Sequence, residues 1–145
     1  MVNWNYEIKI EDMSDEQLEE RIKSAMDYKI PHEIRSIPYI GQEYVVEAEV
    51  VKYSTEELVA RCPVTGYPDF YSLCLEYIPS QRIPELKSLK FYLTDYNEIP
   101  ISHEHLAVKI YADFLEAVNP LALRLELIVA IRGGITTTVV LGEIG

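Results

Sequence analysis

The sequence predicts an α+β domain, in which an antiparallel four-stranded sheet carries helices on one face. The order of the elements supports this class, because two strand-like segments precede two amphipathic helical stretches and two strand-like segments follow. At 145 residues the chain is long enough for one domain with a sizeable hydrophobic core. An open sheet leaves two edges unpaired, so we expect copies of the chain to assemble through them.

Alternation of apolar and polar residues predicts the four strands. The first covers residues 42–53 and the second residues 70–78, with a loop at 54–69 between them. Residues 121–131 alternate most regularly, and the β-branched segment 135–141 completes the sheet. This pattern predicts neighbouring strands that run antiparallel.

Two helices are predicted between the second and third strands. Pro84 suits the first turn of one helix, and Ser102 begins another that ends at Asn119. Each helix has one apolar face that would lie on the sheet. The residues expected to be buried are Leu86, Leu89, Leu93 and Tyr96 in the first helix, and Leu106, Ile110, Phe114 and Val118 in the second.

We interpret residues 1–40 as an N-terminal arm and residues 41–145 as the catalytic domain. Ser14 followed by Gln17 is a capping-box pattern, which opens a helix over about 15–28. Nothing in the arm points to chemistry. We therefore expect it to pack on the domain or to contact another subunit.

The charge balance limits the possible partners. The chain has 13 Lys and Arg residues against 24 Asp and Glu residues, a formal net charge of −11. Nucleic-acid binding draws much of its affinity from cations that neutralise phosphates, so nucleic acid is an unlikely partner. No apolar run approaches the roughly 20 residues of a membrane span. Two cysteines make no disulfide framework, so we expect a cytoplasmic protein without a membrane partner.

Cys62 and Asp69 are candidates for a reactive pair. Cys62 lies in the predicted loop, where an activated thiolate can attack an electrophilic carbon. Asp69, seven residues later, can donate a proton if burial favours its protonated form. The ordinary alternatives are a buried apolar cysteine and a turn-capping aspartate. Cys74, between Leu73 and Leu75, we interpret as a core residue.

The start of the second helix, His103-Glu104-His105, is a further candidate. Zinc proteases need histidines four residues apart, and position 107 is alanine. The two cysteines and these histidines have no metal-ligand spacing, so we expect no metal. A glutamate at a helix N-terminus usually serves as a dipole partner or cap. Beside a histidine it can also accept the donor edge of a purine-like base.

Cations near two turns suggest a small phosphate ligand. Lys87 and Lys90 lie three residues apart on one helix face. Arg132 precedes Gly133 and Gly134, where the backbone can approach a phosphate and the arginine can bind it. A β-turn is the ordinary alternative for Arg-Gly-Gly. The sequence has no dinucleotide-binding Gly-x-Gly-x-x-Gly or Walker pattern.

Five motifs follow one another in order along residues 42–138. They are Cys62-Pro63-x-Thr65-Gly66-x-Pro68-Asp69-Phe70, Tyr77-Ile78-Pro79, Glu85-Leu86-Lys87-Ser88-Leu89-Lys90-Phe91-Tyr92, His103-Glu104 and Arg132-Gly133-Gly134-Ile135. Together they resemble the NADPH-dependent 7-cyano-7-deazaguanine reductases, the nitrile reductases of queuosine biosynthesis. The Glu-Leu-Lys-Ser-Leu-Lys block is the most specific of the five.

The resemblance implies a tunnelling fold, whose barrel is completed by homo-oligomerisation and whose active sites lie between subunits. It implies that Cys62 forms a covalent thioimide with the substrate nitrile, that Asp69 donates a proton, and that His103 assists. Two hydrides from NADPH would then give the aminomethyl product. The implied substrate-binding residues for the deazapurine are Pro84, Glu85, Leu86, His103 and Glu104. The implied cofactor-binding residues are Lys87, Ser88, Lys90, Arg132 and Gly133.

Two alternatives stay open. An archaeal-type amidinotransferase would form the same thioimide on a nitrile carried by tRNA, with ammonia in place of hydride. The intact Glu-Leu-Lys-Ser-Leu-Lys block and the acidity of the chain argue against it. A non-catalytic purine- or pterin-binding module of the same fold would tolerate the loss of Cys62.

Overall fold

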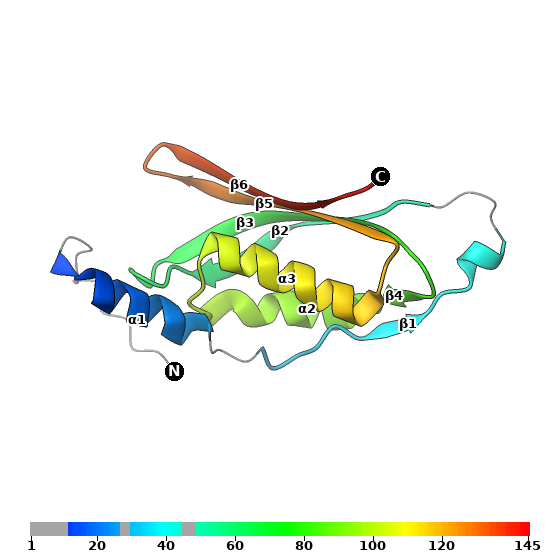
Figure 1. Cartoon of the computed structure of the whole chain (residues 1–145), viewed down its shortest axis with the longest axis horizontal. Coiled ribbons are helices and arrows are strands. Elements are labelled where there is room, and N and C mark those ends of the chain that lie inside the picture. The colour runs from blue at the N-terminus through cyan, green and yellow to red at the C-terminus, as the bar shows by residue number, and fades with distance from the viewer. Residues whose placement is uncertain (1–11, 27–29, 45–48) are drawn as a thin grey trace.

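The computed structural model describes residues 12–26, 30–44 and 49–145. Figure 1 shows two layers, with a curved antiparallel sheet on one side and helices α2 and α3 beneath it. The elements in chain order are α1 Asp15–Met26, β1 Ser36–Pro38, η2 Gly41–Glu43, β2 Val51–Arg61, β3 Pro68–Ile78, β4 Arg82–Pro84, α2 Leu86–Thr94, η3 Asp95–Glu98, α3 His103–Val118, β5 Ala122–Arg132 and β6 Ile135–Glu143.

The main sheet has the strand order β2-β3-β5-β6, with every neighbouring pair antiparallel. The predicted α+β class, with a four-stranded sheet and helices on one face, is therefore confirmed. A second, two-stranded sheet pairs β1 with β4 and was not predicted. Strands β2 and β6 form the two edges of the main sheet.

The first strand was predicted only partly in the right place. Of the expected range 42–53, residues 51–53 belong to β2, residues 42–43 belong to the 3-10 turn η2, and residues 45–48 lie outside the described part of the chain. Strand β2 continues through much of the expected 54–69 loop. A bulge between Thr55 and Leu58 explains the error. Before it the odd-numbered residues point towards the helices, and after it Leu58 and Ala60 do so, at 2% and 0% exposure. Because the bulge changes the parity, no single alternation runs through this strand.

The core lies between the sheet and α3. All four residues predicted to face inward from α3 are buried, as are Leu123, Leu125 and Leu127 of β5. Full burial of one such side chain stabilises a fold by roughly 1.5–3 kcal/mol. Leu121 and Ile131, at the ends of the predicted alternation, are instead exposed.

Helix α2 begins later than expected. Pro84 ends β4, and Glu85 is the N-cap of α2. Leu86 was predicted to be buried but is 57% exposed, since it borders an open pocket between α2 and β2. Tyr92 takes its place in the buried stripe.

Cys74 is not a core residue, contrary to the prediction. Successive strand residues point to opposite faces, so Leu73 and Leu75 face the helices and Cys74 faces away. Its sulfur atom is half-buried and lies 3.9 Å from Glu76 Oε1.

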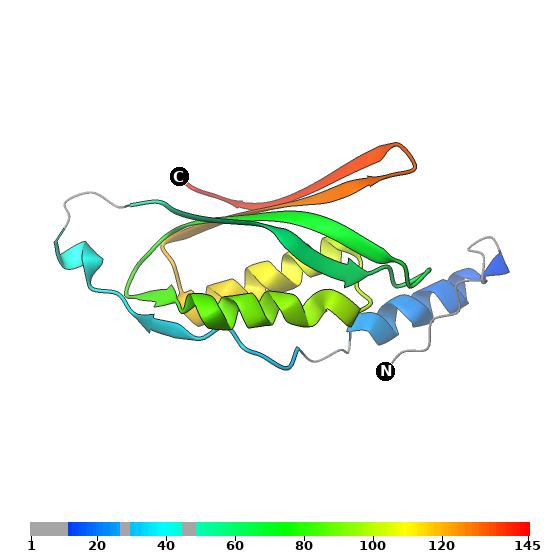
Figure 2. The ribbon, with the colours of Figure 1, turned by 180° about the vertical axis from the view of Figure 1, so that it is seen from behind.

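The elements define two ends of the molecule. Figures 1 and 2 show the β2–β3 hairpin, the start of α3 and the β5–β6 hairpin at one end. Strand β4 and the first turn of α2 lie at the other. At about 3.3 Å per residue, strands of this length keep the ends roughly 30 Å apart. Within the described part of the chain, no helix is both long and apolar enough to cross a membrane.

Candidate active site

Cys62 occupies a tight turn directly after β2. Its backbone N–H donates to the Tyr67 carbonyl at 2.9 Å, and its carbonyl accepts from the Gly66 N–H at 2.8 Å. Gly66 has φ +77°, a left-handed conformation that glycine adopts at little cost. The turn therefore fixes the backbone of Cys62 on both sides, while the residue itself is partly exposed.

The residue before Cys62 connects this turn to α3. The Arg61 N–H donates to the Ile99 carbonyl at 2.9 Å, and the Ile101 N–H donates to the Arg61 carbonyl at the same distance. The Arg61 guanidinium lies 3.2 Å from Glu98 Oε1. These contacts hold the end of β2 alongside the segment that leads into α3.

Asp69, Tyr71 and His103 meet beside this segment. Asp69 is 5% exposed, and its Oδ2 lies 4.0 Å from His103 Nδ1. The Tyr71 hydroxyl is closer to the same nitrogen, at 2.8 Å, and the two rings pack edge to face. Because Nδ1 is engaged from the protein side, Nε2 is the ring nitrogen that can meet a bound molecule.

Sequence reasoning missed Tyr71, although a signal was present. Residues two apart on a strand share a face, so Asp69 and Tyr71 point together towards the helical layer. The first residue of that layer's longer helix is His103. The Asp-x-Tyr spacing at the start of a strand was therefore enough to suggest this contact.

The N-terminus of α3 is capped by Ser102. Its hydroxyl accepts from the His105 N–H at 3.4 Å and also lies 2.6 Å from His105 Nδ1. The cap therefore uses His105, whereas His103 and the exposed Glu104 occupy the first helical turn. The free N–H groups of such a turn favour negative charge nearby.

A second group of predicted residues lies on α2. The Glu85 carboxylate accepts hydrogen bonds from the backbone N–H groups of Lys87 and Ser88. The Ser88 hydroxyl accepts from the Arg35 N–H at 2.8 Å and donates to the Glu85 carbonyl at 2.7 Å. Both side chains thus stabilise the helix start. Lys87 and Lys90 are exposed, as Leu86 is.

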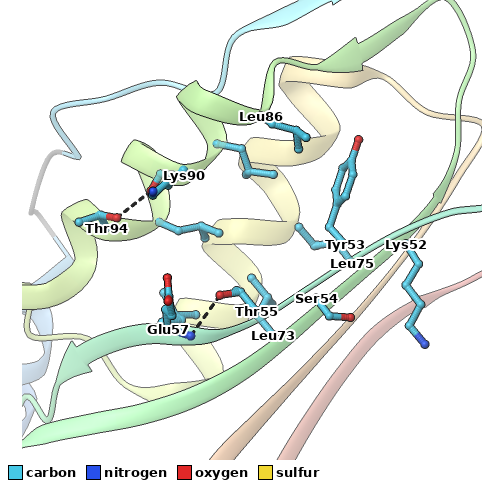
Figure 3. A pocket seen from close by; sticks show the side chains of 13 residues that line it. Lys52, Tyr53, Ser54, Thr55, Glu57, Leu73, Leu75, Leu86, Lys90 and Thr94 are labelled. Carbon is cyan, nitrogen blue, oxygen red and sulfur yellow. Dashed lines mark hydrogen bonds between the residues drawn. The ribbon is translucent and has the colours of Figure 1, made fainter.

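Helix α2 borders a pocket of about 540 Å³ that opens between it and β2. Figure 3 shows Leu86 and Lys90 on the helix side, facing Tyr53 and Thr55 of the strand. Apolar side chains form much of the lining, including Leu58, Leu73, Leu75, Leu89 and Leu93. Cys62, Asp69 and His103 do not line it.

The structure thus separates the predicted residues into two groups. Cys62, Asp69, His103 and Glu104 belong to elements at one end of the subunit. Pro84, Glu85, Leu86, Lys87, Ser88 and Lys90 belong to the other end. Arg132 ends β5 and Gly133 begins the β5–β6 turn, at the end that carries the Cys62 turn. One subunit does not bring the lysine pair near Cys62.

The arrangement of the first group has a clear chemical capacity. A thiol on a fixed turn can add to an electrophilic carbon. A buried carboxyl group and an imidazole beside the same segment can supply and accept protons. In the described part of the chain, no three His, Cys, Asp or Glu side chains gather as metal ligands would.

Comparison with known proteins places the chain among related sequences. A family model described as "QueF-like protein" matches residues 68–144. A Caldicellulosiruptor bescii protein named "NADPH-dependent 7-cyano-7-deazaguanine reductase" is 40% identical over 129 residues, 88% of this chain and 96% of that protein. A protein of the same name from Thermoanaerobacter pseudethanolicus is 39% identical over 129 residues, 88% of this chain and 95% of its own.

A solved structure supports the fold. The crystal structure of "the archaeosine synthase QueF-Like in the apo form" superposes with a TM-score of 0.62 at 24% identity, over 68% of this chain and 96% of that one. The sheet and its two covering helices define a tunnelling-fold protein. The chain belongs to the QueF-like family, and the resemblance seen in its sequence is confirmed.

Proposed function

We propose that this protein is an NADPH-dependent 7-cyano-7-deazaguanine reductase, which converts the nitrile to an aminomethyl group in queuosine biosynthesis. The main support is that the Cys62 turn, Asp69 and His103 gather at one end of a chain 40% identical to a reductase of that name over 88% of its length. A thiol that can attack carbon, with a carboxyl group and an imidazole that can transfer protons, suits the reduction of a nitrile.

The first step would be addition of the Cys62 thiol to the nitrile carbon. A carbon–sulfur bond would form while the S–H bond and one carbon–nitrogen π bond break, and the nitrogen would receive a proton. Asp69 is the proposed donor of that proton, since its carboxyl group is buried beside the segment that holds the turn. His103 would orient the substrate, accept the proton that the thiol releases and return it to Asp69. The product of this step is a covalent thioimide.

NADPH would supply the two hydrides that reduce the carbon, each matched by one proton to nitrogen. After the first reduction, the Cys62–carbon bond would break with its electron pair on sulfur, and a proton would regenerate the thiol. The exposed Lys87 and Lys90 fit a cofactor phosphate, since two cations three residues apart on a helix can bind it together. Ser88 on the same helix would complete this cofactor site together with Arg132 and Gly133 of a neighbouring subunit, since the β5–β6 turn lies at the opposite end of the chain. The cytoplasm, where such a cofactor is regenerated, is the expected location.

The deazapurine would bind between two subunits, where the Cys62 end of one copy meets the α2 end of the next. Glu104, exposed in the first turn of α3, would accept the donor edge of the guanine-like ring beside His103. The backbone of Pro84, Glu85 and Leu86 would contribute from a second copy. This requires a homo-oligomer, and the unpaired edges β2 and β6 offer a way to build one.

The amidinotransferase remains the second candidate, because it would use the same Cys62 thioimide. The solved archaeosine synthase structure, at 24% identity, supports only the fold. The formal net charge of −11 disfavours a tRNA substrate.

The decisive experiment mixes the purified protein with 7-cyano-7-deazaguanine and follows both NADPH absorbance and intact protein mass. A reductase oxidises two NADPH per nitrile. A mass increase equal to the substrate without NADPH oxidation would favour the transferase, to be tested with nitrile-bearing tRNA and ammonia. Substrate binding with neither signal would favour the non-catalytic module.

A further inference from the structure

The N-terminal helix reaches the turn that carries Cys62. Both ribbon views place α1 beside the tip of the β2–β3 hairpin (Figures 1 and 2). The Arg21 Nε–H donates to the Pro63 carbonyl at 2.8 Å, across 42 residues of sequence. The bond is partly buried, so water competes with it less than with a surface contact.

The position of this carbonyl makes the contact relevant to Cys62. Pro63 is buried and directly follows the proposed nucleophile. Proline has no N–H group, so its carbonyl is the one backbone hydrogen-bonding group through which this residue can be held. The N–H and carbonyl of Cys62 are already bound within the turn. The Arg21 bond therefore fixes the next peptide unit, which limits how far the turn can rotate.

Arg21 is well placed to act as a fixed donor. Its helix starts at a complete capping box, in which Ser14 N–H donates to Gln17 Oε1 and Gln17 N–H donates to Ser14 Oγ. Arg21 lies in the second turn and is partly buried. A guanidinium holds its N–H groups in fixed directions, unlike the mobile ammonium group of lysine.

We infer that Arg21 is a positioning residue for Cys62, so that the N-terminal helix forms part of the active site. The inference rests on the proposed function, because it assigns Arg21 to the step in which the thiol adds to the nitrile. By holding the Pro63 carbonyl, Arg21 keeps the thiol in the direction that attack requires. A small displacement of a reacting atom is enough to slow such a step.

The test uses the full-length protein without NADPH and follows thioimide formation by intact mass. Arg21→Ala should slow adduct formation by about 10-fold or more, since attack depends on orientation. Arg21→Lys keeps a donor and should recover part of the rate. Lys23→Ala is the matched control, because Lys23 is exposed on the same helix and pairs with Glu19 at 2.9 Å. Its adduct rate should equal that of the unaltered protein.

A second readout does not depend on the substrate. Iodoacetamide labelling, quantified by peptide, compares Cys62 with Cys74 as an internal reference. In Arg21→Ala, Cys62 labelling should rise by at least about threefold as the turn gains freedom, while Cys74 labelling stays constant. The melting temperature checks that the fold is retained.

An unchanged adduct rate would overturn the inference, as would a loss accompanied by faster labelling of both cysteines and a lower melting temperature. If the unaltered protein forms no adduct and oxidises no NADPH, the proposed function fails. In that case the labelling of Cys62 alone decides whether Arg21 holds the turn.

Discussion

The two ends of the subunit hold their functional groups in different ways. At the Cys62 end, the groups are fixed inside one chain by backbone hydrogen bonds, the buried Asp69 and the Tyr71–His103 contact. At the α2 end, Glu85 and Ser88 fold back onto the helix start. Lys87 and Lys90 are exposed instead.

This difference suggests a division of labour. Covalent chemistry needs atoms held to within a fraction of an ångström, and the Cys62 end has the internal contacts to achieve it. Binding a charged cofactor needs exposed cations, and the α2 end offers them. Since strands of this length keep the ends roughly 30 Å apart, the proposed site would require the α2 end of a second copy of the chain.

Loss of the thiol should have the largest effect. Cys62→Ala should abolish NADPH oxidation, to below about a thousandth of the original rate, because no covalent step remains. Binding of the deazapurine, measured by calorimetry, should persist. Cys74→Ala is the matched control and should keep near-full activity, since this residue faces away from the helices. If the Cys62→Ala variant still oxidised NADPH, the proposed covalent step at Cys62 would be wrong.

The lysine pair tests the opposite end. The Lys87→Ala, Lys90→Ala double variant should raise KM for NADPH by about 10- to 100-fold, with a smaller change in kcat and little effect on NADH use. The exposed Lys23→Ala serves as control. A kcat loss without a KM change would assign these lysines another role.

Mixing Cys62→Ala with the lysine variant, assayed at an NADPH concentration far below the KM of the lysine variant, tests whether the ends meet between subunits. If Cys62 and the lysines come from different chains, random 1:1 hybrids of Cys62→Ala with the lysine variant restore about a quarter of the sites. Reassembly from denatured subunits, followed by the NADPH assay, measures this. No recovery would mean that each chain uses its own two ends or acts alone.

Tyr71→Phe should have a moderate effect at the Cys62 end. Without the hydroxyl group, His103 Nδ1 loses its nearest partner, and kcat should fall by about 3- to 10-fold while KM for NADPH stays constant. Nitrogen-15 chemical shifts of His103 should show an altered mixture of tautomers. Unchanged shifts would mean that Tyr71 only packs against the ring.

The helical layer that joins the ends should lose stability in alkali. The Tyr92 hydroxyl donates to Asp113 Oδ2 and lies 2.7 Å from the Tyr96 hydroxyl. Burial is the main cause that raises the pKa of both tyrosines above 10, so the fold favours their neutral forms. Their contribution is complete below pH 10 and is lost above it, where only the unfolded chain ionises readily.

Urea unfolding at several pH values measures this loss. The midpoint should fall above pH 10 in the unaltered protein and fall less steeply in Tyr92→Phe. At pH 7 the variant should be less stable by about 1 kcal/mol, because Asp113 loses a donor. Parallel curves for the two proteins would contradict the prediction.

Local patterns predicted much of this fold. Helix α3 was correct at its cap, its end and its buried face, since 16 residues give several turns of regular periodicity. Strand β2 was misplaced because a bulge reverses the alternation between Thr55 and Leu58. The pairing of β1 with β4 involves three residues on each strand, too few for a periodic signal.

The candidate site divides in a similar way. The motifs and residue types led to predicted roles for Cys62, Asp69 and His103, which stay predictions. They did not point to Arg21 or Tyr71, whose contacts join residues 42 and 32 positions apart in the sequence. Nor did they reveal that one subunit separates the lysines from Cys62, since that follows from the direction of the strands.

The bulge in β2 also affects how a newly folded chain behaves before it meets its partners. An unpaired strand edge can pair with a strand of another chain and start aggregation, and a twisted, charged edge makes such pairing unfavourable. Glu56 and Glu57 lie exposed at the irregularity in β2. We expect them to keep newly made chains from aggregating while correct partners are still scarce. Light scattering during refolding of a Glu56→Val, Glu57→Val variant would show faster aggregation if the edge is guarded in this way.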